Sequence, residues 1–184
     1  MGYEVYLKRN EEKRLLAGHP WVYANEAARI EGKDKNGSLA TVRAFDGRFI
    51  GKGYINHASK ILVRLFIRGD EEDGEELWKE RVSAAWAFRK KLGYENCCRV
   101  VFGEADGLPA LIVDKYADIL VVQCLSLGVH QRKDRIVKIL SELFSPRGIY
   151  ERSDAAVLSK EGLLPEKGVL YGRCRTKSSL KKTA

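Results

Sequence analysis

The first 70 residues alternate short extended runs with turn signals, and this spacing constrains the fold more than any other feature of the chain. Residues 3–8 alternate apolar and polar side chains as a strand does, and 11–18 form a short helical turn. Asp46-Gly47 predicts a two-residue hairpin, because glycine accepts the positive φ of a primed turn. Further strands are predicted at 20–24, 26–31, 38–45, 48–55 and 60–68. So many short strands predict a small, closed or nearly closed β-barrel.

The pattern changes after an acidic stretch at 70–76. Apolar residues recur at helical spacing over 75–92, and Gly93 ends that predicted helix. A three-stranded antiparallel meander, a helix and a final strand are predicted next, at 98–102, 109–114, 118–123, 129–144 and 148–152. The predicted fold class is therefore α+β, a small β pseudo-barrel at 1–72 followed by a mixed α+β domain at 73–172. The last residues, 173–184, are predicted to be a disordered basic tail.

The net charge of +8 is concentrated at the two ends of the chain. Residues 1–70 hold 13 basic and 8 acidic residues, and 173–184 hold 5 basic and no acidic residue. A basic first domain favours a polyanionic partner, because neutralising phosphates supplies most of the sequence-independent affinity for nucleic acid. A merely solubilising surface is the alternative. We expect a cytoplasmic protein with no membrane partner, because the chain has neither a membrane span nor a signal peptide.

The residues that could carry chemistry are few. Cys97, Cys98, Cys124 and Cys174 lack the C-x-x-C spacing of a zinc or redox site, so we expect reduced, buried thiols and no metal. A reactive dithiol at the adjacent pair is the less favoured alternative. The three histidines lie far apart, and Gly51-Lys-Gly53 falls inside a predicted strand, which argues against a phosphate loop. These patterns exclude the common hydrolase and nucleotide-binding classes.

Two other constellations remain. Glu104 and Asp106 would share a face as an acid/base pair, but a turn whose carboxylates cap backbone amides is the favoured interpretation. The first domain interleaves Trp21, Tyr23 and Tyr54 with basic residues. Unstacked bases pack on such aromatic rings while Lys and Arg bind phosphates, so this composition favours RNA binding.

The residues also carry a family resemblance. His19-Pro20-Trp21-Val22-Tyr23 and Gly51-Lys-Gly-Tyr-Ile-Asn56 resemble the PUA domain of the bacterial 23S rRNA cytosine-5 methyltransferase I family. The segments 99–114 and 148–154 resemble the family's central, EEHEAD-type domain. This resemblance covers about 1–172 and implies a PUA-like barrel that grips 23S rRNA, with a homodimer as a further partner. The RNA-binding surface it suggests, together with charge, comprises His19, Trp21, Arg43, Arg48, Lys52, Tyr54, Lys60 and Arg64.

The sequence departs from the family after Gly172. The resemblance implies a Rossmann-like domain there that binds S-adenosylmethionine and supplies the catalytic cysteine, but 173–184 do not match it. We therefore expect a truncated form without a cofactor of its own, with no catalytic residue, inactive alone. Two alternatives stay open. One is a protein-interaction module that pairs through an exposed strand such as 109–114 or 118–123. The other is activity in trans with a separately encoded catalytic domain.

Overall fold

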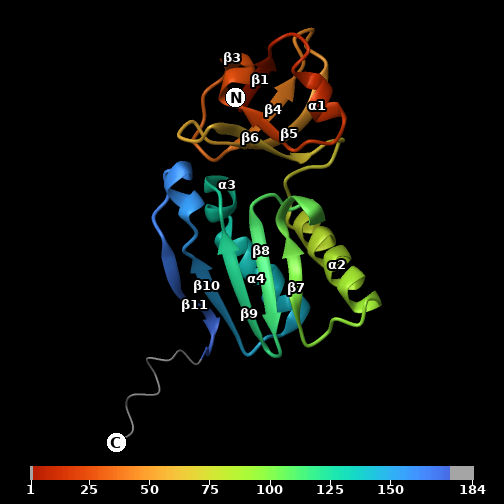
Figure 1. Cartoon of the computed structure of the whole chain (residues 1–184), viewed down its shortest axis with the longest axis vertical. Coiled ribbons are helices and arrows are strands. Elements are labelled where there is room, and N and C mark those ends of the chain that lie inside the picture. Colours follow the sequence, from red (N-terminus) through yellow and green to blue (C-terminus); the bar gives the residue numbers. More distant parts are fainter. Residues whose placement is uncertain (1, 175–184) are drawn as a thin grey trace, which may run out of the picture.

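The structure is a computed structural model that describes residues 2–174, so most of the predicted basic tail lies outside the described residues. Two sheets lie at opposite ends of the molecule (Figure 1). The first has six strands in the order β2-β6-β5-β4-β1-β3 and is antiparallel except between β1 and β4. Its elements are β1 Tyr3–Leu7, α1 Glu12–Leu16, β2 Trp21–Tyr23, η1 Ala24–Glu26, β3 Ala27–Glu31, β4 Leu39–Arg43, β5 Phe49–Ile55 and β6 Ile61–Ile67. This sheet confirms the predicted pseudo-barrel.

Alternation of apolar residues places the barrel core. Val5 and Leu7 on β1 and Val42 on β4 point inward and are fully buried. Strand β6 differs, because every residue from Leu62 to Ile67 is buried. A strand buried on both faces needs cover outside the barrel as well as inside it.

The hairpin between β4 and β5 forms where predicted, but its turn is of another kind. Gly47 N donates to Ala44 O at 3.0 Å, and Ala44 N donates to Arg48 O at 2.8 Å. Gly47 has a φ of 88°, whereas Asp46 is not in the positive-φ region. The predicted two-residue primed turn is therefore wrong: a four-residue turn ends on a left-handed glycine, which adds a residue to the loop.

The Gly51-Lys-Gly53 pair lies within β5, in agreement with the rejection of a phosphate loop. A Cβ on Gly53 would lie 2.1 Å from Arg64 O on the neighbouring strand. The pairing of β5 with β6 also shifts register between Lys52 and Gly53. Glycine is required here because the two backbones approach closely at an irregularity of the barrel wall.

The second sheet has five strands in the order β11-β10-β9-β8-β7. Strands β7, β8 and β9 form the predicted antiparallel meander, β9 and β10 are parallel, and α2 and α4 pack on the sheet. Its elements are α2 Glu75–Lys91, β7 Cys97–Phe102, η2 Gly103–Asp106, β8 Leu111–Tyr116, β9 Ile119–Cys124, α3 Leu127–His130, α4 Lys133–Phe144, β10 Gly148–Ser153, η3 Ala156–Glu161 and β11 Glu166–Gly172. The α+β fold class is confirmed.

Three sequence predictions for this second unit need correction. The helix predicted at 129–144 is two helices, because Arg132 leaves helical geometry and its guanidinium donates to Gly37 O and Gly128 O. The strand at 148–152 is not the last one, since β11 pairs with it along the outer edge. Strands β8 and β9 are paired on both sides, so the segments 109–114 and 118–123 offer no open edge.

The two units share one hydrophobic cluster. Tyr54 and Phe66 of the barrel sheet stack at 5.5 Å between ring centroids, and Trp78 of α2 packs against both. Asp73 accepts hydrogen bonds from the Tyr54 hydroxyl at 2.9 Å and the Trp78 indole at 3.0 Å. We call the contact between the barrel and the second unit the seam. It covers the outer face of β6, which explains why that strand is buried throughout.

Candidate nucleic-acid interface

Three rings stand side by side at the edge of the barrel sheet. Strand β2 is an edge strand with β6 as its one neighbour, so its side chains are only partly covered. His19 and Trp21 meet edge to face with centroids 5.5 Å apart, and Trp21 and Tyr23 meet in the same way at 6.4 Å. All three are partly exposed. Alternation along the chain therefore places three flat groups in one row, as stacking with unpaired bases requires.

Arg14 of α1 contacts the residues of this row and helps to fix their positions. Its guanidinium contacts His19 Nδ1, donates to Trp21 O at 3.1 Å and pairs with the buried carboxylate of Glu26. Trp21 N also donates to His19 Nδ1, at 3.1 Å. Because Nδ1 accepts from two donors, the neutral His19 ring carries its proton on Nε2. That nitrogen is then a hydrogen-bond donor suited to a phosphate or a base oxygen.

The second unit fixes the Trp21 ring from the other side. Its indole Nε1 donates to Glu104 Oε1 at 2.8 Å, and the Arg64 guanidinium lies 5.6 Å from the ring centroid. Asp106 has a different task, since it pairs with Arg89 at 2.6 Å and accepts from Phe102 N at 2.6 Å. The two carboxylates are thus separately occupied, which supports the structural interpretation of this turn over an acid/base pair.

Two exposed lysines belong to segments that contact this edge of the barrel. Lys60 is exposed, and its carbonyl accepts from Ala24 N at 3.0 Å, directly after Tyr23. Lys160 is also exposed and precedes Glu161, which binds Ser59 across the seam. Neither ammonium has a carboxylate partner among residues 2–174. We define the β2 strip as His19, Trp21, Tyr23, Lys60 and Lys160.

Two residues predicted to bind RNA are buried instead. Tyr54 and Arg64 pair across β5 and β6, in the row that includes Trp21, and this row faces the second unit. Tyr54 is in the shared cluster, and burial raises its pKa strongly, so its hydroxyl is neutral. Arg64 pairs with Glu161 at 2.7 Å, with only 7% of its side chain exposed. The prediction of an RNA surface that includes these two residues is wrong, because the seam covers them.

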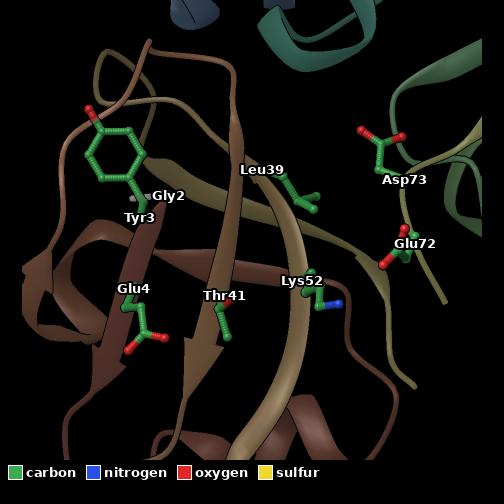
Figure 2. A pocket seen from close by; sticks show the side chains of 8 residues that line it. All are labelled: Gly2, Tyr3, Glu4, Leu39, Thr41, Lys52, Glu72 and Asp73. Atoms are coloured by element: carbon green, nitrogen blue, oxygen red, sulfur yellow. The ribbon is translucent and has the colours of Figure 1, made fainter. Parts of the chain in front are cut away.

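Arg43 and Lys52 lie elsewhere on the barrel. Lys52 lines an open pocket of about 460 Å³ together with Glu4, Glu72 and Asp73 (Figure 2). Arg43 donates to Glu4 at 3.0 Å, and this hydrogen bond lowers the pKa of the Glu4 carboxyl. The surroundings are acidic and would repel phosphates. The structure therefore brings together His19, Trp21 and Lys60 from the predicted set, but not Arg43 and Lys52.

Arg48 is exposed beside the β4–β5 turn, apart from the strip, and its backbone N donates to Asp46 at 3.1 Å. The RNA-binding surface predicted from the sequence does not include Lys160 or Tyr23. Tyr23 could have been included, because it is two residues from Trp21 on the same predicted strand. Lys160 could not, since nothing in the sequence brings residue 160 to the barrel.

The four cysteines differ in their exposure. Cys124 is buried, but Cys97 is exposed and Cys98 and Cys174 are partly exposed, so the expectation of buried thiols holds for one of the four. Burial raises the pKa of the Cys124 thiol to about 12, which leaves it protonated and unreactive.

The side chains of His130, Glu151 and Glu166 lie close enough to hold a metal ion. Lys133 already pairs with both carboxylates, however, at 2.7 Å from Glu151 and in closer contact with Glu166. Its ammonium occupies both carboxylates and balances one of their two charges, so the cluster is accounted for as an ion-pair network. Within the described residues, no helix is both long and apolar enough to cross a membrane.

The curled barrel sheet with its aromatic edge agrees with the comparison to known families: residues 5–68 match the family of PUA-like domains. Over 94% of its length the chain is 38% identical to the ribosomal RNA large subunit methyltransferase I of Shewanella amazonensis, covering 44% of that protein. It is 35% identical to the methyltransferase of the same name from Alteromonas mediterranea, over 98% of this chain and 47% of that one. The chain spans less than half the length of these relatives.

Solved structures agree on the fold. A putative SAM-dependent methyltransferase from Streptococcus mutans superposes with a TM-score of 0.77, over 96% of this chain and 45% of that one, at 15% identity. A putative methyltransferase complexed with SAH has the same TM-score at 16% identity, over 95% of this chain and 44% of that one. The solved structures confirm the fold, and the sequence relatives support homology with rRNA methyltransferases.

Proposed function

We propose that this chain binds ribosomal RNA through the β2 strip and contributes that binding to an S-adenosylmethionine-dependent methylation of large-subunit rRNA. The observation that carries the proposal is the row of partly exposed rings on an edge strand, with the exposed Lys60 and Lys160 on neighbouring segments. Rings stack on unpaired bases and ammonium groups bind phosphates, so this arrangement suits single-stranded or flipped-out nucleotides. The names of the relatives point to large-subunit rRNA as the target.

The finer proposal is 5-methylcytosine formation in 23S rRNA. Cytosine C5 methylation uses a thiolate that attacks C6 of a flipped base. We assign that thiolate to none of the cysteines in 2–174; Cys124 in particular is buried, and burial raises its pKa. In this proposal the described residues hold the RNA, and activity in trans would be seen as methyl transfer only after mixing with a catalytic domain.

Binding to 23S rRNA fragments across salt concentration tests the proposal. Affinity should fall steeply with salt and exceed that for duplex DNA of equal length. Trp21→Ala should weaken binding about tenfold through lost stacking, and Lys60→Ala should lower the salt slope by roughly one phosphate contact. Lys91→Ala is the matched control, because Lys91 is equally exposed but lies at the far end of α2. A flat salt response, or equal affinity for DNA, would refute RNA binding.

Self-association is the second candidate function, and it rests on β7, one of the two edge strands of the second sheet. Phe88, Leu92 and Tyr94 are each at least 55% exposed and surround a pocket of about 360 Å³ beside this strand. A second copy of the chain could cover the apolar patch and pair with the edge. Sedimentation should then depend on protein concentration, and Leu92→Asp should abolish that dependence without changing RNA affinity.

A further inference from the structure

A second aromatic group is exposed on the barrel, away from the β2 strip. Phe45 occupies the β4–β5 turn, where polar residues are usual, and half of its surface is exposed. The guanidinium of Arg9 lies over its ring, 4.5 Å from the centroid. Arg9 has no carboxylate partner within residues 2–174. The turn therefore presents two flat groups in contact, each of a kind on which nucleobases stack.

A small pocket opens beside this pair. Its volume is about 270 Å³, slightly below the range of about 300–1,000 Å³ that holds drug-sized ligands, so it suits a single ring system. Its walls are formed by Arg9, Asn10, Glu12, Phe45 and Asp46. Asn10 has a φ of 69°, a conformation that asparagine tolerates better than other residues with a side chain. Glycine is the usual residue at a positive φ. Asparagine at this position instead adds a side chain to the pocket wall.

The charged residues that line the pocket favour a base over a phosphate. Glu12 and Asp46 line it and would repel a phosphate, but their oxygens accept hydrogen bonds from an exocyclic amino group. The exposed cations Lys8, Lys13 and Arg48 flank the same segments along the chain, outside the lining. The arrangement therefore separates a base site inside from phosphate sites around it.

The turn beside the pocket and the row that holds Trp21 lie toward opposite ends of β5. Strand β5 begins at Phe49 beside the turn, and five residues later Tyr54 lies in the seam, next to the row that holds Trp21. Five residues of strand span roughly 17 Å at about 3.3 Å each. An RNA segment of a few nucleotides can therefore reach both.

We propose that the pocket beside the Arg9–Phe45 pair binds one unstacked, amino-bearing base of single-stranded RNA, with the neighbouring phosphates along Lys8, Lys13 and Arg48. This site deepens the proposed function, on which it rests, by adding a second contact on the barrel. Adenine, cytosine and guanine carry the amino group that Glu12 or Asp46 would accept from, whereas uracil does not.

The test uses the full chain and two short RNAs, tri-adenylate and tri-uridylate, followed by the NMR signals of the Phe45 ring. Tri-adenylate should shift these signals upfield and bind more tightly than tri-uridylate. Phe45→Leu should weaken tri-adenylate binding about tenfold, the contribution of one stacked base, while Phe45→Tyr should retain it. Arg9→Lys, which keeps the charge but loses the flat group, should also weaken binding.

Phe88→Leu is the matched control, because Phe88 is 55% exposed and has Arg89 5.4 Å from its ring. If Phe45→Leu and Phe88→Leu bind tri-adenylate equally well, the pocket is refuted. The two proposals can fail separately. Salt-dependent binding of rRNA fragments with unshifted Phe45 signals would overturn the pocket alone, whereas shifted Phe45 signals without rRNA binding would overturn the function of the β2 strip.

Discussion

Glu161 is the residue of the seam whose loss should cost the most stability. It is 2% exposed, and its carboxylate accepts from Ser59 Oγ at 2.7 Å, Arg64 Nη2 at 2.7 Å and Asn56 Nδ2 at 3.1 Å. Glu161→Ala leaves the Arg64 charge buried without this partner, a change that typically costs about 3–5 kcal/mol. Glu104 lies 3.8 Å from the same guanidinium and compensates in part, so we expect about 3 kcal/mol.

Urea unfolding followed by tryptophan fluorescence measures this loss. With a slope of about 2 kcal/mol per molar urea, the midpoint should fall by about 1.5 M. Glu142→Ala removes an exposed partner of Lys79 and should change stability by less than about 1 kcal/mol. Combining Glu161→Ala with Arg64→Met should cost less than the sum of the two single changes, because no unpaired charge remains. A midpoint within 0.5 M of the wild type, roughly 1 kcal/mol at this slope, would refute the reasoning.

Three further predictions concern single residues. Burial opposes ionisation of Asp73, but hydrogen bonds from Trp78 and the charge of Arg132 outweigh it and lower the pKa below 3.8. Its stabilisation is therefore present above that pH and is lost as the pH falls through the folded-state pKa. In Asp73→Asn, the urea midpoint should fall less steeply as the pH is lowered than it does in the wild type. Cys124 should stay unmodified by a thiol reagent at pH 8 while Cys97 reacts, as mass spectrometry would show. Gly53→Ala should cost about 1–3 kcal/mol by urea unfolding, and Gly168→Ala, whose Cβ meets nothing within 4 Å, far less.

Local patterns predicted most of the fold, and the errors arose where a local apolar pattern is missing or where distant segments decide the structure. Strands with alternating burial, such as β1 and β4, were predictable because one face is apolar and the other is not. Strand β11 was missed because both of its faces are largely exposed, which leaves Glu166–Gly172 without a periodic apolar face. The break at Arg132 depends on partners at Gly37 and Asp73, which sequence reasoning cannot place beside residue 132.

The site was predictable to the extent that it is local. Trp21 and Tyr23 share a face because they are two residues apart on one strand, and His19 precedes them. Tyr54 and Arg64 were misjudged because their cover comes from a distant segment. One signal was readable: Leu62–Ile67 is apolar at every position except Arg64, as expected of a strand buried on both faces. A charge inside such a run implies a buried partner, here Glu161.

The seam also decides whether the barrel can act by itself. Residues 1–72 contain all the rings of the β2 strip, but not the carboxylates that hold Trp21 and Arg64. Without Glu104 and Glu161, Arg64 would lose its partners, and the outer face of β6 would be exposed to water. The Trp21 ring would also lose the hydrogen bond that fixes its orientation, and an ordered ring binds a base with less loss of conformational entropy than a mobile one. The barrel supplies the rings and the second unit holds them in place, so the RNA-binding unit we propose is the pair.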